Sequence, residues 1–124
     1  MEYKYSFEKL EVWSDARMFV VEIYKLTKTM PSDEKFGLCS QLQRATVSIV
    51  SNKAKGTTRT SDKEKIRFVE VAYGSLKEVY CQFCIAFDLA YISDIQLENQ
   101  KNTIDLIAKK LSGLKNAYQK RLNS

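Results

Sequence analysis

Hydrophobic residues recur along this chain at alternating steps of three and four, the spacing that lines side chains along one face of an α-helix. Four segments follow this pattern, and the residues expected to face inward in them are Trp13, Ala16, Val20, Ile23, Thr27 and Met30; Leu38, Leu42, Ala45, Ile49 and Asn52; Ile66, Val69, Tyr73, Leu76, Tyr80, Phe83, Phe87 and Ala90; and Leu97, Ile104, Ile107, Leu111, Leu114 and Tyr118. The sequence therefore predicts four amphipathic helices.

Helix-breaking residues are expected to end the first two segments. Pro31 is expected to stop the first helix, and Ser32 is expected to cap the second, with acidic residues directly after it. Gly56 is expected to end the second helix as a left-handed cap, followed by a loop over residues 57–60.

Two capping boxes mark the starts of the last two helices. Ser61 with Glu64, and Ser93 with Gln96, have the spacing at which side chain and backbone satisfy each other at a helix start. A turn of only a couple of residues before Ser93 predicts an antiparallel hairpin of two helices of roughly 30 residues, or ~45 Å. Their length exceeds that of the first two helices, so part of it has no partner within one chain.

The predicted fold class is all-α, an antiparallel up-down-up-down four-helix bundle. The chain of 124 residues has the usual length of one domain, so we expect a single domain over residues 1–124, with an extended tail over residues 1–6. Gly74 lies in the middle of the third helix, where glycine costs ~1 kcal/mol relative to alanine, which predicts close approach of another backbone; a helix break there is the alternative.

Composition and chain start give an expectation about location. No apolar run reaches the ~20 residues of a membrane span, and the first residues lack the order of a signal peptide, so we expect a cytoplasmic protein. The three cysteines, Cys39, Cys81 and Cys84, fit reduced thiols packed in a core better than a disulfide framework.

Positive charge is segregated into two blocks. Residues 44–67 contain seven Lys and Arg against two acids, and residues 101–124 contain six against one, so each block has a net charge of +5. The whole protein has a net charge of +5, so the remainder is acidic. Segregation of this kind creates a local positive potential that favours a polyanionic partner.

The sequence offers no candidate catalytic residues, metal ligands or cofactor site, and we expect a protein that is not an enzyme. Cys81 and Cys84 form a C-x-x-C motif, but the chain has no histidine, and only Cys39 could add a third thiolate for zinc. Carboxylates on the third helix lack the Glu-x-x-His pairs of di-metal bundles. Phosphate-cradling glycine motifs are absent as well.

The strongest functional candidate is the first basic block, as a nucleic-acid-binding corner formed by the second helix, the loop and the third helix. Its cations are Arg44, Lys53, Lys55, Arg59, Lys63, Lys65 and Arg67. Contacts to phosphates need no sequence code, and motifs for sequence-specific reading are absent. A purely structural role for these cations is the alternative, because Lys53 and Lys55 also suit the C-terminal, negative end of a helix dipole.

The chain resembles a known bacterial family on particular runs of sequence. These are Phe7 to Trp13, Gly37-Leu38, Gln41 to Ala45, Val47 to Ile49, Ser51-Asn52, Gly56, Arg67-Phe68 and Ala72 to Glu78. They look like the four-helix bundle proteins encoded in 23S rRNA intervening sequences, and the resemblance extends from about Phe7 to Leu122. A similar protein is the accessory variability protein of diversity-generating retroelements. The resemblance to it implies a five-subunit barrel that binds nucleic acid and a reverse transcriptase.

Four positions depart from the family pattern. Val50 stands where the family commonly has proline, and Lys53 and Lys55 stand where it has an apolar and an acidic residue. Tyr80 stands where a second acid is frequent. We expect a straighter second helix and a higher local charge. The main hypothesis is thus a homo-oligomer, a pentamer by resemblance, that binds RNA or DNA backbone. The alternative is an oligomeric adaptor that docks a partner protein, its basic patch serving solubility or an acidic partner.

Overall fold

A computed structural model describes residues 10–124 of the chain. Over these residues the chain forms four α-helices, α1 (Glu11–Thr27), α2 (Leu38–Thr57), α3 (Asp62–Asp88) and α4 (Asp94–Asn123). A short 3-10 helix, η2 (Ser32–Glu34), lies between α1 and α2, and the described residues contain no strand. The tail expected over residues 1–6 lies outside the described residues. The all-α prediction is confirmed.

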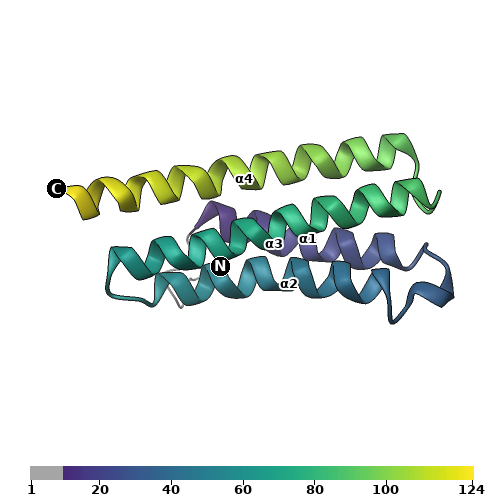
Figure 1. Cartoon of the computed structure of the whole chain (residues 1–124), viewed down its shortest axis with the longest axis horizontal. Coiled ribbons are helices and arrows are strands. Elements are labelled where there is room, and N and C mark those ends of the chain that lie inside the picture. The colour runs from purple at the N-terminus through teal and green to yellow at the C-terminus, as the bar shows by residue number, and fades with distance from the viewer. Residues whose placement is uncertain (1–9) are drawn as a thin grey trace.

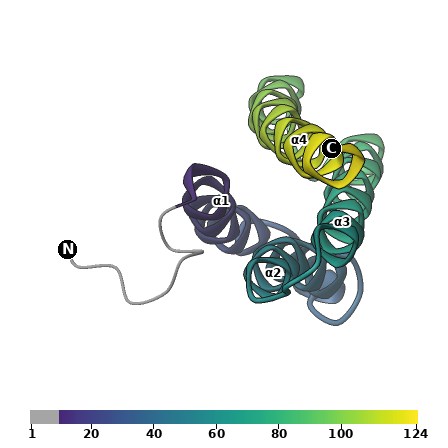
Figure 2. The ribbon, with the colours of Figure 1, turned by 90° about the vertical axis from the view of Figure 1, so that its left-hand side faces the viewer.

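The helices run alternately up and down and pack in chain order (Figure 1). Contacts are extensive between α2 and α3 and between α3 and α4, and α1 packs mainly on α2. Contacts between α1 and α4 are sparse, so the bundle is open on that side, as the view along its axis shows (Figure 2). The helices α3 and α4 have 27 and 30 residues against 17 and 20 in the first two, as predicted.

One hydrophobic core runs the length of the bundle, and most of its helix positions follow the predicted spacing. Leu76, Phe83, Ile107 and Leu111 are fully buried, as expected. On α1 the buried face is rotated, because Val12 and Phe19 are buried whereas Trp13 and Val20 are only half-buried. Several α1 positions satisfy a three-four step in two registers, so periodicity alone could not choose between them.

The second helix begins later than predicted. Ser32 starts the short η2 and makes no side-chain cap hydrogen bond, and α2 starts only at Leu38. The Leu38 N–H instead donates to Glu34 Oε1 over 3.5 Å, and the Tyr91 hydroxyl donates to Glu34 Oε2 over 3.0 Å. Glu34 therefore connects the start of α2 with the α3–α4 turn, a tertiary contact that local sequence does not reveal.

The third helix ends earlier than its hydrophobic spacing predicts. It stops at Asp88, and Ala90 adopts a left-handed conformation with φ of 62°. The Tyr91 N–H donates to the Ala86 carbonyl over 2.9 Å, which closes the helix end in the manner of a Schellman motif. Phe87 and Ala90, expected to face inward, are exposed, and five residues rather than a couple separate α3 from α4.

The structure contradicts the roles predicted for two glycines, Gly56 and Gly74. Gly56 is not left-handed but buried inside α2, where an added Cβ would lie 3.0 Å from the Phe68 Cβ. Its lack of a side chain allows α2 and α3 to approach closely. Gly74 lies within an uninterrupted α3, and a Cβ there would meet no atom within 4 Å. The close approach expected at Gly74 occurs at Gly56 instead.

The predicted helix starts at Ser61 and Ser93 are correct. The Gln96 N–H donates to Ser93 Oγ over 3.1 Å, and the Ser93 N–H donates to Gln96 Oε1 over 2.8 Å, which completes a capping box. At α3 only half of the box forms, where the Glu64 N–H donates to Ser61 Oγ over 3.0 Å.

Candidate nucleic-acid interface

One end of the bundle is built from the last turn of α2, the α2–α3 loop, the first turns of α3 and the last turns of α4 (Figure 2). Because α3 and α4 are antiparallel, the end of the second basic block lies beside the first block. Arg121 Nη2 lies 2.6 Å from Asp62 Oδ1. We call this surface the basic end, and its cations are Lys55, Arg59, Lys63, Lys65, Arg67, Lys120 and Arg121.

Most cations of the basic end are open to solvent, and its acids are few. Residues 55–67 and 118–124 hold seven cations against Asp62 and Glu64, a net charge of +5. All seven side chains are exposed except that of Lys65, which is half-buried. Since Asp62 is engaged by Arg121, it does little to offset the other cations.

Tyr118 organises the inner side of the basic end. It is buried, and the charged groups of Arg121, Lys53 and Lys65 lie 5.1, 5.6 and 5.8 Å from its ring centre. A cation at this distance is attracted by the π face of the ring. Burial raises the pKa of the Tyr118 hydroxyl, so the ring stays neutral at physiological pH. Tyr118 thus holds together cations from α2, α3 and α4.

Lys53 does not belong to the exposed surface on which the sequence placed it. Its side chain is 1% exposed and follows Leu42, Ala45 and Ile49 on the buried face of α2. Burial, and then the positive charge of Lys65, lowers the pKa of Lys53 to about 8. The burial of this position could have been inferred from the sequence, because the family that the chain resembles has an apolar residue there. The three-four spacing predicts Asn52 as the inward residue, one position before the residue that is buried.

Arg44 also lies apart from the basic end. It is exposed on α2, eleven residues before Lys55, which corresponds to ~16 Å along the helix. The structure therefore brings together Lys55, Arg59, Lys63, Lys65 and Arg67 of the predicted set, separates Arg44 from them and buries Lys53. Lys120 and Arg121 belong to the second basic block, whose lysines were expected to extend the surface, and they join the site through the antiparallel packing of α4 on α3.

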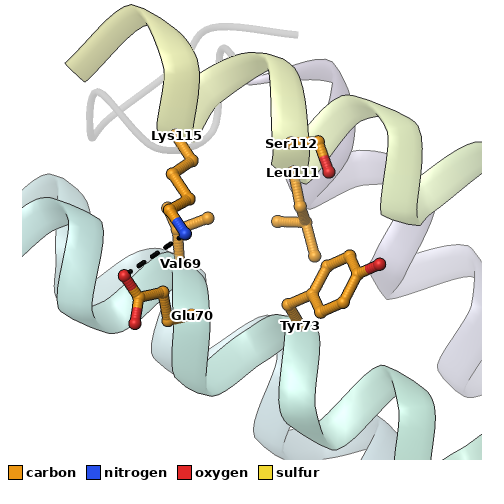
Figure 3. A pocket seen from close by; sticks show the side chains of 6 residues that line it. All are labelled: Val69, Glu70, Tyr73, Leu111, Ser112 and Lys115. Atoms are coloured by element: carbon orange, nitrogen blue, oxygen red, sulfur yellow. Dashed lines mark ion pairs between the residues drawn. The ribbon is translucent and has the colours of Figure 1, made fainter. Parts of the chain in front are cut away.

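A small pocket between α3 and α4 lies next to this region (Figure 3). It has a volume of about 150 Å³, with Val69, Tyr73 and Leu111 among its lining residues. Lys115 Nζ lies 3.5 Å from Glu70 Oε1 at one side of the pocket, so its charge is compensated. The pocket is therefore a poor site for a phosphate.

The cysteines are separated by the fold. Cys39 is buried as predicted, whereas Cys81 is exposed and Cys84 is half-buried, so the C-x-x-C pair does not form the core that the sequence suggested. Within residues 10–124, no group of three or more Cys, Asp or Glu lies close enough together to hold a metal ion. None of the helices in that range combines the length and hydrophobicity that a membrane-spanning helix needs.

Comparison with known proteins identifies the family. The family model of the 23S rRNA-intervening sequence protein matches residues 8–113. The chain belongs to this family. Residues 114–124, which carry Lys120 and Arg121, lie beyond the matched region. No curated protein matches the chain in sequence.

A solved structure is similar to this chain in fold. It is the crystal structure, at 1.70 Å resolution, of a protein with unknown function from the S23 ribosomal protein family of Bacteroides thetaiotaomicron VPI-5482. The two chains are 24% identical with a TM-score of 0.78, and the match covers 85% of this chain and 95% of the other. At this identity the likeness shows the shared four-helix fold.

Proposed function

We propose that this family member is a non-enzymatic protein that binds RNA or DNA backbone through its basic end. The observation that carries the proposal is the convergence of exposed cations from three chain segments on one surface with few acids. Contacts between Lys or Arg and phosphates release counterions and do not depend on base sequence. Binding is therefore expected to be strong at low salt and similar for unrelated sequences.

The test removes three exposed cations of the basic end by Lys55→Gln, Arg59→Gln and Lys63→Gln in one variant. Affinity for oligonucleotides of unrelated sequence is measured by fluorescence anisotropy over a range of salt concentrations. The variant should bind more weakly to all of them, and the slope of log affinity against log salt should fall by roughly 0.7–0.9 for each lost phosphate contact.

A matched control removes the same charge elsewhere, by Lys25→Gln, Lys28→Gln and Lys35→Gln. These lysines are exposed near the η2 end of the bundle, away from the basic end. The control variant should keep the wild-type salt slope. Equal losses in the two variants, or no binding by the wild-type protein at low salt, would overturn the proposal.

Self-association is part of the same proposal. On α3, Gly74 is exposed with no atom within 4 Å of an added Cβ, and Val71 and Ile85 are 44% and 49% exposed. An uncovered small and apolar stripe of this kind supports the approach of a second chain. A closed ring would repeat the basic end and let weak contacts act together on one long ligand. Native mass spectrometry measures the subunit number, and a monomer at tens of micromolar contradicts this part.

A second candidate function is an adaptor that docks a partner protein. It is favoured by exposed apolar side chains at the opposite end of the bundle, where Phe36 is 90% exposed, Ile95 70% and Leu89 49%. The Tyr91–Glu34 hydrogen bond joins the α3–α4 turn, which carries Leu89 and leads into Ile95, to the connection before α2, which carries Phe36. The salt titration separates the two functions. If the wild-type protein does not bind nucleic acid even at low salt, the nucleic-acid-binding function is excluded and the adaptor function is favoured.

A further inference from the structure

A groove with a volume of about 490 Å³ lies between α1 and α2 and extends beyond the basic end. Its lining residues come mainly from one side of α2, with one residue from α1; they are Tyr24, Gln43, Arg44, Val47, Ser48, Ser51, Asn52 and Lys55. Lys55 belongs both to this groove and to the basic end. The groove therefore continues from the proposed phosphate-binding surface along α2 toward Arg44.

The lining of the groove has a net positive charge. Arg44 and Lys55 are its ionisable cations, no acid lines it, and over residues 10–124 neither cation lies within ion-pair distance of a carboxylate. The α3–α4 pocket differs, because Glu70 compensates its lysine there (Figure 3). The groove between α2 and α3 also differs, because Glu78 lines it together with Arg44. The α1–α2 groove is thus suited to an anionic chain.

The groove also presents an aromatic ring and a fixed polar lining. Tyr24 is 41% exposed and Val47 is 40% exposed, so an apolar face is available next to Arg44. The Asn52 amide donates to the Ser48 carbonyl over 2.8 Å, and the Gln43 amide donates to Thr27 Oγ1 over 3.0 Å. Because these amides are held by the protein, ligand binding need not order them.

We infer that the α1–α2 groove binds single-stranded nucleic acid, with a base stacked on Tyr24 and phosphates beside Arg44 and Lys55. This inference rests on the proposed function and narrows it to unpaired strands at this groove. An exposed aromatic ring beside cations is the arrangement with which proteins hold single strands, since the faces of bases are accessible only when they are unpaired. The lining from Gln43 to Lys55 extends ~18 Å along α2, the length of a few nucleotides.

The first experiment compares a single-stranded 12-nucleotide RNA with the duplex of the same sequence, by fluorescence anisotropy. Tyr24→Leu should weaken binding of the single strand at least fivefold, the lower end of what one stacked base contributes, and change duplex binding little. Tyr24→Phe, which keeps the ring, should bind like the wild type. Tyr73→Leu is the matched control, because Tyr73 lies at the charge-compensated α3–α4 pocket, and it should leave single-strand binding unchanged.

The second experiment locates the strand directly. The same RNA with 5-iodouridine is cross-linked to the wild-type protein by light, and the modified peptide is identified by mass spectrometry. Adducts within residues 20–28, around Tyr24, support the inference. Adducts confined to residues 59–67 or 118–124, or equal single-strand affinity for Tyr24→Leu and wild type, overturn it and leave the proposed function standing. Absence of binding to both the single strand and the duplex at low salt overturns both.

Discussion

At the scale of single residues, Lys53 shows how the position of a side chain on a helix decides its chemistry. Lys53 and Lys55 are separated by one residue, yet Lys53 is buried and Lys55 is exposed. The pKa of Lys53 falls to about 8 from the ordinary 10.5 of an exposed lysine, first through burial and then through the charge of Lys65. The folded protein therefore binds fewer protons than the unfolded chain between about pH 8 and pH 10.5.

This difference predicts that Lys53 makes stability rise with pH over that window. Compared with Lys53→Met, the wild-type protein should gain on the order of 1–3 kcal/mol of unfolding free energy between pH 7 and pH 10. Urea unfolding of both proteins at several pH values measures the gain, and other titrating groups cancel in the comparison. Lys55→Met is the control and should show no such change. A difference between wild type and Lys53→Met that is independent of pH would refute the assignment of a buried amine.

Ala90 offers a second prediction at this scale. Its left-handed φ of 62° is strained for a residue with a Cβ and free of strain for glycine. Ala90→Gly should therefore stabilise the protein by about 1 kcal/mol, measured by thermal unfolding. Ala117→Gly, at an exposed position inside α4, should instead destabilise it by about the same amount. The same sign for both substitutions would contradict this account of the α3 end.

At the scale of helices, two glycines in helix interiors have opposite roles. An added Cβ at Gly56 would lie 3.0 Å from Phe68 Cβ, whereas one at Gly113 would meet nothing within 4 Å. Gly56→Ala should therefore destabilise the α2–α3 packing in spite of the better helix propensity of alanine. Gly113→Ala should raise stability by up to ~1 kcal/mol. Thermal unfolding of the two variants tests the pair, and a stabilising Gly56→Ala would show that α2 can move away from α3.

Local signals in the sequence located the helices well, and tertiary contacts account for the errors. The Ser93 capping box and the buried Leu76 and Phe83 are local or strongly periodic features, and the structure confirms them. The late start of α2 depends on Glu34, which is tied to Tyr91 from 57 residues away. Gly56 resembles a helix cap in sequence, because nothing local indicates that Phe68 packs against it.

The candidate site was predictable in its charge but not in its shape. The block from Arg44 to Arg67 contains most of the basic end, since charge can be counted from the sequence. Which residues belong to the site depends on the direction in which each side chain leaves its helix, and this direction buries Lys53. It also depends on the antiparallel packing of α4, which places Arg121 beside Asp62. Binding through this end stays a prediction.

At the scale of the whole molecule, the open side of the bundle between α1 and α4 is bridged mainly by charge. The helices α1 and α4 make few contacts, and Lys110 of α4 bridges them through hydrogen-bonded ion pairs with Glu11, over 2.8 Å, and with Asp15. Hydrogen bonds to Asp15 and then to Glu11 raise the pKa of Lys110, so the bridge stays charged at neutral pH. Little apolar packing supports α1 on this side, and the bridge fixes how α1 and α4 approach.

Reversal of this bridge should loosen α1 selectively. Lys110→Glu places three acids together, and we expect a melting temperature lower by a few degrees and faster amide hydrogen exchange in α1 than in α2 or α3. Adding Asp15→Lys restores an opposite-charge pair between the helices and should recover part of both losses, because the two substitutions act on one contact.

Lys109→Glu is the control, since Lys109 is exposed and, among residues 10–124, has no ion-pair partner. If Lys109→Glu and Lys110→Glu lower the melting temperature equally, net charge rather than the bridge is responsible. If amide hydrogen exchange in α1 is the same in Lys110→Glu as in the wild-type protein, the packing of α1 on α2 alone holds α1 in place.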